Sequence, residues 1–376
     1  MLFLGAGASK TFGIKTLQEM SSDLIQMMQA KGYADTVERI ISALNRFHMT
    51  PDFEAIYTIV EGLTNLPKAI QESGAFTAFV CKDLLEIQPL HDSVRADLEG
   101  MLLLFNDFIY NECKMKRESI TEIESVYDRL LNILNKQQEE RVLEENREAG
   151  RKLAYQVGIG DTIVTTNYDM IVESYHRIKR RNYADGFRMV KGDPTIKEMD
   201  LTTYLKENER WLIKLHGSIY EYKYENNIFK TIEDPEKSDI PVRIQEKMVI
   251  YPTKEKPILK YPYYDFYEVF RGQKWIKLVA VGYSFRDDPV NNAILANLEK
   301  VDRSILIVVN PNPKEVIQNL GTLALSQFDD RIIPIQGKLV DEEVFQDLED
   351  AVKTASKKRF YERKQERLGE KMHSTS

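Results

Sequence analysis

The hydrophobic positions of the chain follow two patterns, and the first is helical. Over residues 17–153, apolar residues recur three and four positions apart, as they do between Val37 and Leu44. This spacing places them on one face of a helix and predicts a long helical region. Thr50-Pro51-Asp52 is typical of a helix start, so a new helix is expected from Phe53.

The second pattern consists of short, continuous apolar runs, which predict strands buried on both faces of a sheet. These runs are 1–4, 162–165, 211–215, 278–281, 304–309 and, more weakly, 332–335. Helical stretches lie between several of them, at 170–177, 264–270 and 290–301. Alternating strands and helices predict an α/β fold, a Rossmann-like, doubly wound and mostly parallel sheet with a large helical insertion.

The change of pattern suggests three parts. Residues 1–16 and 154–340 are predicted to form the Rossmann-like domain, 17–153 the helical insertion domain, and 341–376 a charged C-terminal helix or tail. The tail begins acidic and ends basic, which suits a helix dipole and favours a solvated terminal helix over an arm that docks to a partner. Residues 220–261 are polar, and turn signals such as Asn226-Asn227 indicate a small excursion with a hairpin.

Composition and charge exclude several classes of function. The net charge of −7 and the isoelectric point near 5.5 offer no basic face for phosphates, so direct nucleic-acid binding is not expected. No apolar run approaches the roughly 20 residues that span a membrane, and a cytoplasmic location is expected. Cys81 and Cys113 are far apart, and the five histidines show no ligand spacing. We therefore expect buried thiols and no metal site.

Polar residues follow five of the predicted strands, at the edge where doubly wound sheets bind ligands. In chain order, these groups contain Gly5, Ala6, Gly7 and Ser9, then Thr166, Asn167 and Asp169, then His216, then Gly282 and Ser284, and finally Asn310 after the fifth strand. Each has an ordinary structural explanation. The glycines can form a generic strand-to-helix turn, Asn167 or Asp169 can cap the next helix, and His216, Gly282, Ser284 and Asn310 can serve structural turns.

The order of these motifs resembles that of the sirtuins across the Rossmann-like part. The resemblance implies an NAD+ site in which Gly5, Ala6, Gly7 and Ser9 form the phosphate loop and Asn167 and His216 are catalytic. It further implies that Thr166, which replaces a sirtuin glutamine, and Asp169 line the site, that Gly282 and Ser284 contact the dinucleotide, and that Asn310 lies near the adenosine ribose.

Two differences from the sequences of the sirtuin deacylases argue against deacylation as the activity. Gly13-Ile14 is followed by Lys15-Thr16 rather than by their Pro-Asp-Phe-Arg, and their four zinc cysteines are missing. The amino-acid sequences of the motifs resemble those of sirtuin-like domains of prokaryotic antiviral defence more closely than those of the deacylases. That resemblance implies an NAD+ glycohydrolase, which releases nicotinamide and ADP-ribose and acts as an antiphage effector through NAD+ depletion. The alternatives are a sirtuin-type ADP-ribosyltransferase or deacylase, and a non-catalytic subunit that binds NAD+ or ADP-ribose.

The same resemblance implies partners. Proteins of this length and plan in antiviral defence are similar in forming homo-oligomers and in pairing with a HerA-like hexameric ATPase, so both are expected here.

Overall fold

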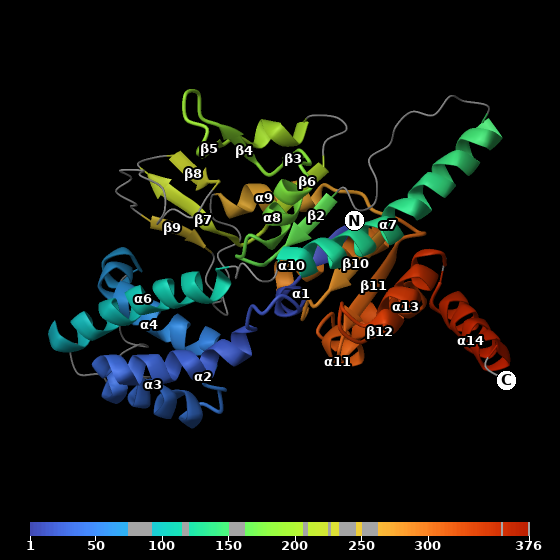
Figure 1. Cartoon of the computed structure of the whole chain (residues 1–376). Helices are drawn as coiled ribbons and strands as arrows, with labels where there is room; N and C mark the ends of the chain where they lie inside the picture. Colours follow the sequence, from blue (N-terminus) through green and yellow to red (C-terminus); the bar gives the residue numbers. More distant parts are fainter. Residues whose placement is uncertain are drawn as a thin grey trace. The chain divides into compact units, whose positions relative to one another are not determined.

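The computed structural model describes residues 1–73, 92–114, 120–149, 162–205, 210–224, 227–232, 246–249, 262–354 and 356–374. The chain forms two compact units (Figure 1). The first contains Met1–Ile14, Met115–Val249 and Ile258–Ser376, and the second contains Lys15–Lys114 and Ile250–Pro257.

The first unit is built on a seven-stranded sheet whose described pairings are all parallel. Its order is β12-β11-β10-β1-β2-β6-β3. The strands are β1 (Leu2–Leu4), β2 (Thr162–Thr165), β3 (Tyr183–Ala184), β6 (Arg210–Lys214), β10 (Lys277–Val281), β11 (Ile305–Asn310) and β12 (Ile332–Gln336). The predicted Rossmann-like α/β fold is confirmed, and each of the six predicted runs is a strand of this sheet.

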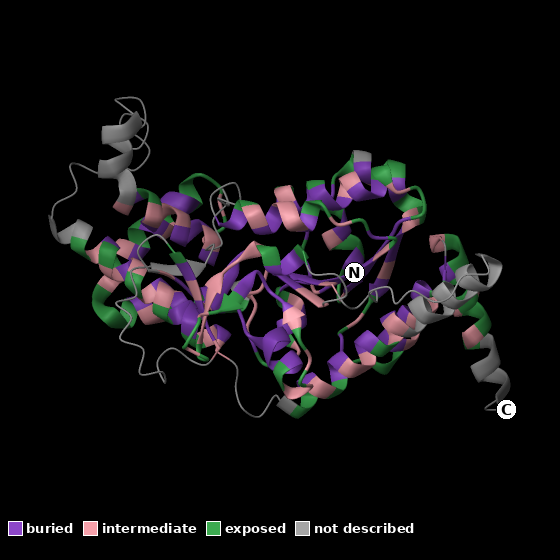
Figure 2. Ribbon diagram, turned by 90° about the horizontal axis from the view of Figure 1, so that it is seen from above, coloured by how far each residue is buried: buried purple, intermediate pink, exposed green. Residues whose placement is uncertain are grey.

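Burial explains why these strands could be predicted. Leu2, Phe3, Val164, Val279 and Val308 all have relative exposures of 0%, and they lie on four neighbouring strands. Figure 2 shows the sheet as a buried layer, in purple. Strands covered by helices on both faces must be apolar at every position, not at every second one.

The strand order creates a switch point at β1, the central strand. After β1 the described strands β2, β3 and β6 lie on one side of it, and β10, β11 and β12 lie on the other. In open α/β sheets, ligands bind beyond the carboxyl ends of the strands at such a point. The turns that follow β1 and β10 therefore mark the expected crevice.

A second, antiparallel sheet belongs to the same unit, in the order β4-β5-β8-β7-β9. Its strands are β4 (Phe187–Met189), β5 (Ile196–Met199), β7 (Gly217–Tyr224), β8 (Asn227–Thr231) and β9 (Glu246–Val249). Strands β7 and β8 pair as an antiparallel hairpin within the predicted region 220–261, although residues 225–226, 233–245 and 250–261 of that excursion lie outside the described residues. The other strands of this sheet were not predicted.

Helices of the first unit pack on the parallel sheet and on one another. They are α1 (Ala6–Lys10), α7 (Ile120–Ala149), α8 (Ile171–Ile178), α9 (Tyr263–Arg271), α10 (Asp288–Lys300), α11 (Pro313–Gln318), α12 (Thr322–Phe328), α13 (Glu342–Val352) and α14 (Lys357–Ser374). Helices α8, α9 and α10 confirm the three helical stretches predicted between strands.

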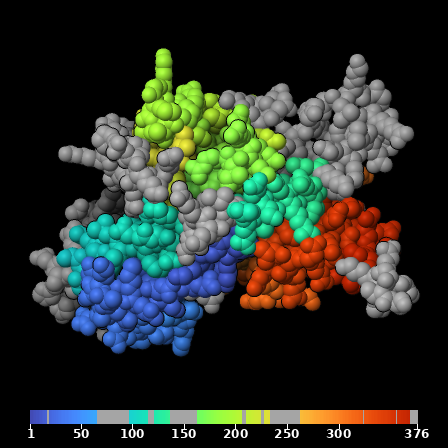
Figure 3. All heavy atoms as spheres, in the orientation of Figure 1, coloured from blue at the N-terminus to red at the C-terminus, as the bar shows by residue number. Residues whose placement is uncertain are grey.

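The C-terminal segment differs from a single solvated helix. Helix α13 packs on β11 and β12 and buries Val344, Phe345 and Leu348, which stand at helical spacing. Helix α7 packs on α8 and α13, and Figure 3 shows it beside the red C-terminal segment. This helix therefore lies with the first unit, although the sequence grouped it with the insertion. The remaining domain boundaries stay predictions.

The second unit is helical in its described part. It contains α2 (Leu17–Met28), a π-helical turn (Gln29–Tyr33), α3 (Ala34–Arg46), α4 (Phe53–Ser73) and α6 (Asp92–Cys113). The helix start predicted at Pro51-Asp52 is confirmed, because Asp52 Oδ1 accepts the Ala55 N–H over 2.9 Å and α4 begins at Phe53. Cys113 is a buried free thiol, whereas Cys81 lies outside the described residues. No described helix is long and apolar enough to cross a bilayer.

Candidate active site at the strand tips

Glycines join the turn after β1 to the turn after β10. The Gly5 N–H donates to the Val281 carbonyl and the Gly7 N–H to the Gly282 carbonyl, each over 2.9 Å. A Cβ atom at Gly7 would lie 2.8 Å from the Cα of Gly282, and one at Gly282 would lie 2.3 Å from the Ala8 nitrogen. Gly282 also has a φ of +61°, a left-handed conformation that favours glycine. The two strand tips therefore meet backbone to backbone, which requires glycine on both sides.

Asn167, after β2, is fixed by this glycine turn. Its Nδ2 donates to the Gly5 carbonyl over 2.9 Å and to Ser9 Oγ over 2.8 Å. A side-chain amide has two N–H donors, and both are directed toward the turn after β1. The remaining polar atom is the acceptor Oδ1, and the residue is half-buried. Asn167 is therefore oriented to accept a hydrogen bond from a hydroxyl or a water molecule.

Asp169 supports the turn after β1 through a hydrogen bond to Ser9. Its Oδ2 accepts the Ser9 hydroxyl over 2.6 Å, and its Oδ1 accepts the Ile171 N–H at the start of α8 over 3.0 Å. Burial raises the pKa of this carboxyl group, and the charge of Lys214 opposes that effect. With its oxygens committed to Ser9 and Ile171, Asp169 fits a role in positioning the loop.

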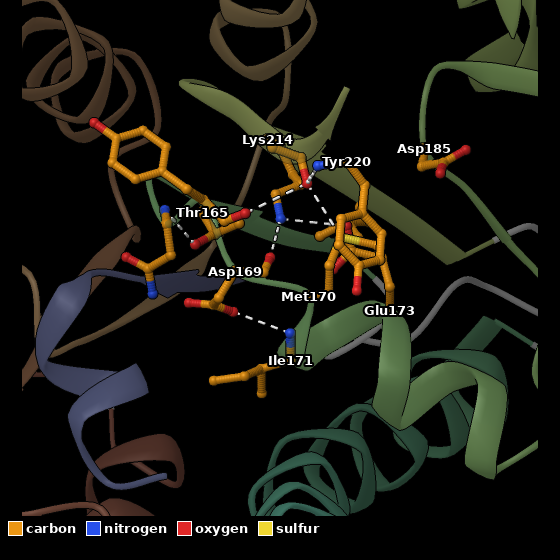
Figure 4. Close-up of polar contacts among 12 residues, drawn as sticks. Thr165, Asp169, Met170, Ile171, Glu173, Asp185, Lys214 and Tyr220 are labelled. Atoms are coloured by element: carbon orange, nitrogen blue, oxygen red, sulfur yellow. Dashed lines mark hydrogen bonds and ion pairs between the residues drawn. The ribbon is translucent and has the colours of Figure 1, made fainter. Parts of the chain in front are cut away.

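A buried lysine supports the loop further (Figure 4). The Lys214 ammonium, at the end of β6, donates to the main-chain carbonyl of Asp169 and lies 3.2 Å from Glu173 Oε1 on α8. Lys230 on β8 lies 3.1 Å from the same oxygen. Burial raises the pKa of Glu173, but the charges of Lys214 and Lys230 outweigh that effect and hold the pKa at about 2. The carboxylate is therefore ionised at neutral pH, and it ties α8 to both sheets.

His216 follows β6 and contacts an acid that the sequence analysis did not propose. Its Nε2 lies 2.8 Å from Asp287 Oδ2, in the turn between β10 and α10. The side chains are 5% and 1% exposed, respectively. In the sequence, Asp287-Asp288-Pro289 reads as a helix start. Asp287 does cap α10 by accepting the Val290 N–H. Because its other partner is 71 residues away, no local pattern could have revealed it.

These contacts form a closed ring of four strand tips. The turn after β1 is hydrogen-bonded to the turn after β10. Asn167, in the turn after β2, is hydrogen-bonded to the turn after β1. The ends of β2 and β6 are joined because the Leu215 N–H donates to the Thr165 carbonyl over 2.9 Å, and the Ile219 N–H on β7 donates to the Tyr168 carbonyl over 3.0 Å. The His216–Asp287 contact then returns from β6 to β10, and these strands are three places apart in the sheet. The amide of Asn167 and the imidazole of His216 thus stand on neighbouring tips of one ring.

Other predicted residues lie around this ring or outside it. Thr166 is half-buried, and Ala6 and Ser284 are exposed. Asn310 ends β11, and its Oδ1 accepts the Asn312 N–H over 2.9 Å. The side chain of Asn310 thus supports the turn, and its expected place near the adenosine ribose stays a prediction.

Fold and site together define a Rossmann-like α/β protein with polar residues gathered at the switch point of its sheet. The comparison with known families adds a specific likeness, because residues 161–324 match the model of the SIR2-like domain. The match includes Asn167, His216, Gly282 and Asp287, but it leaves out the glycine turn after β1 and covers less than half of the chain. Residues 161–324 are accordingly similar to a SIR2-like domain, and the likeness supports a sirtuin-related, NAD-dependent function. No curated protein matches the chain.

Proposed function

We propose that this protein hydrolyses the bond between nicotinamide and ribose in NAD+. The observation that carries the proposal is the ring of strand tips, because it presents the acceptor Oδ1 of Asn167 and the His216–Asp287 pair at the switch point of a sirtuin-like domain. The residues fit a dinucleotide: the glycine turn lies at the centre of the sheet, and the half-buried amide of Asn167 offers an acceptor rather than a charge.

The reaction needs one positioned water and one proton acceptor. In the proposed step, the bond from nicotinamide nitrogen to the anomeric carbon breaks, the water oxygen bonds to that carbon, and a water proton passes to His216 and then to solvent. The products are nicotinamide, ADP-ribose and a proton. Asn167 orients the water or the ribose hydroxyls, which is catalysis by position. A neutral imidazole has one unprotonated nitrogen that can accept a proton, so His216 suits a general base.

The proposed step uses an uncharged amide and an imidazole of this chain. The nicotinamide ring is positively charged in NAD+ and leaves as a neutral molecule, so the step involves no change of oxidation state. In the described ranges, no three His, Cys, Asp or Glu side chains gather where they could hold an ion, and the expected lack of a metal site stays a prediction.

The decisive measurement is chromatography of NAD+ after incubation with the purified full-length chain. We expect nicotinamide and ADP-ribose in equal amounts, without dependence on an acylated peptide, and a loss of roughly 100-fold in Asn167→Ala. Product formation that requires the peptide would indicate a deacylase, and transfer of ADP-ribose to protein would indicate a transferase. Tight NAD+ binding without any product would leave a binding subunit and refute hydrolysis.

We also propose that assembly restrains this activity, because unrestrained NAD+ depletion would be toxic. The proposed assembly is a homo-oligomer that pairs with a HerA-like hexameric ATPase in antiphage defence. Size-exclusion chromatography with light scattering, for the chain alone and mixed with such an ATPase, tests this. A strict monomer whose NAD+ cleavage is unchanged by the ATPase would contradict it.

A further inference from the structure

The contact between His216 and Asp287 joins the tips of two strands that are not neighbours in the sheet. Strands β6 and β10 are separated by β2 and β1, so each residue must reach over the tips of those two strands. The contact is nevertheless 2.8 Å long, and both side chains are almost wholly buried. A buried carboxylate is costly unless it is paired and hydrogen-bonded. The pairing with His216 is therefore a defined part of the fold.

The loop between β10 and α10, residues 282–287, has a conformation that directs Asp287 toward His216. Along it, Tyr283, Phe285 and Asp287 are buried, whereas Ser284 and Arg286 are exposed. This alternation directs every second side chain inward, and Asp287 is the last of the inward set.

One position in the loop is strained. Phe285 is fully buried with a φ of +53°, a left-handed conformation that is rare for a bulky residue. It persists because its surroundings fix it. The Asn291 amide donates to the Phe285 carbonyl over 2.8 Å, and the Phe285 ring lies 4.8 Å from that of Tyr283. Strain of this kind gathers at functional sites, where a side chain must be placed against local preference.

The two oxygens of Asp287 perform different tasks. Oδ1 accepts the Val290 N–H and caps α10, while Oδ2 faces His216 Nε2. The cap alone needs only one acceptor oxygen, which asparagine also supplies. The carboxylate contributes more than the cap, because an ionised carboxylate accepts hydrogen bonds and cannot donate one.

We propose that Asp287 is a positioning residue, which holds His216 as the tautomer protonated at Nε2 and thereby makes Nδ1 the nitrogen that receives the proton from water. Nε2–H donates to Asp287, the lone pair resides on Nδ1, and the carboxylate stabilises the imidazolium once Nδ1 is protonated. In neutral imidazole one nitrogen donates and the other accepts, and the hydrogen bond made by the first selects the second. This inference rests on the proposed function for its catalytic part, but the tautomer is a property of the resting protein.

The tautomer can be measured without any substrate. Nitrogen NMR of the full-length chain, with labelled histidine, separates the two neutral tautomers, and the signal of His216 is assigned by its absence in His216→Gln. We expect a protonated Nε2 and an unprotonated Nδ1 near neutral pH. In Asp287→Asn, which keeps an oxygen for the α10 cap, the two tautomers should mix because an amide can either donate or accept. A protonated Nδ1 in the wild type, or an unchanged signal in Asp287→Asn, overturns the assignment.

Kinetics test the catalytic part with a double-mutant cycle. Asp287→Asn should release nicotinamide roughly 10- to 1,000-fold more slowly than the wild type, since general-base terms are of about 100- to 10,000-fold and the base is retained but misoriented. Adding Asp287→Asn to His216→Ala should cost almost nothing further, because a residue acting through His216 has no effect without it. Asp341→Asn, a carboxylate that accepts the Lys338 N–H before α13, serves as the control and should retain full activity.

The outcomes separate the two claims. If the wild type shows the expected tautomer but cleaves no NAD+, the hydrolase proposal fails and the positioning role stands. If NAD+ is cleaved and Asp287→Asn, folded by its thermal transition, keeps full activity, hydrolysis stands and the positioning role fails. Equal further losses in the presence and absence of His216 would also refute it, since Asp287 would then act independently.

Discussion

Two buried histidines in the first unit have opposite surroundings. His216 stands at a strand tip with a carboxylate 2.8 Å from its ring. His176 lies in the last turn of α8 and stacks on Tyr183 at 4.7 Å between ring centroids. Among the described residues, neither ring nitrogen of His176 has a hydrogen-bond partner. Burial lowers its pKa to about 4, so the ring stays neutral.

The comparison shows that burial of a histidine says little about its role. As whole residues, His216 and His176 are 4% and 1% exposed. What distinguishes them is a partner that fixes one ring and a position at the carboxyl edge of the sheet. His176 fits a core residue that is tolerated for its shape, and the surroundings of His216 suit the proposed role in proton transfer.

The largest expected effect is a difference in nicotinamide release between substitutions of His216 and of His176. His216→Ala should reduce nicotinamide release by about 100- to 10,000-fold, the size of a general acid-base contribution, with an unchanged fold by circular dichroism. His176→Phe should change it by less than about 2-fold, because surface area and stacking are kept while no step uses this ring. A loss of similar size in both variants would break the comparison.

The next effect concerns stability near His176. Glu173 lies one helical turn before it and is buried against two lysines. Glu173→Gln should cost roughly 3–5 kcal/mol, because it removes one partner of a buried ion pair and leaves buried charge uncompensated. Urea unfolding measures the change. Glu349→Gln breaks a surface pair with Lys353 and should cost no more than about 0.5 kcal/mol, so a comparable loss there would contradict the argument.

A third effect depends on pH. The folded-state pKa of His176 is about 4, below the roughly 6.5 of an unfolded histidine. The neutral ring therefore contributes stability that is present above pH 6.5 and is lost as the pH falls toward 4. Since His176→Phe has no such group, its stability relative to the wild type should rise by about 2 kcal/mol between pH 7.5 and pH 5. Urea unfolding of both proteins at the two pH values tests this, and a constant difference would refute the assigned pKa.

Much of the sheet could be predicted from sequence, because its chemistry is uniform. Strand β2 has the predicted bounds, and the other five runs end within two residues of the strands that formed. A strand covered on both faces shows itself as a continuous apolar run. The ends of these runs also led to the prediction that Asn167 and His216 lie near each other, because parallel strands bring their carboxyl ends to one edge of the sheet.

The buried Lys230 and the partner of His216 could not be predicted, because their interactions join residues far apart in the sequence. Strand β8 carries Lys230, which is 3% exposed and lies 3.1 Å from both Glu173 and Asp185. A lysine in a polar segment is normally interpreted as solvated, and only its partners from α8 and from the loop after β3 make burial possible. Asp287 was missed for the same reason. Its local role as a helix cap is readable, whereas its contact with His216 exists only once β6 and β10 are in one sheet.

The smallest expected effect tests whether stacking, rather than polarity, explains why His176 is tolerated. The ring planes of His176 and Tyr183 are 26° apart at 4.7 Å, whereas those of His216 and Tyr168 are 35° apart at 6.4 Å. Aromatic pairs contribute about 0.5–1.5 kcal/mol beyond the area they bury, and the contribution declines as the rings separate. An alanine double-mutant cycle on the free energy of unfolding should therefore give a coupling in this range, roughly 1 kcal/mol, for the first pair, and less than about 0.5 kcal/mol for the second. Stronger coupling in the second pair would mean that Tyr168 also holds His216 in place, and Asp287 would then share its positioning role with an aromatic ring.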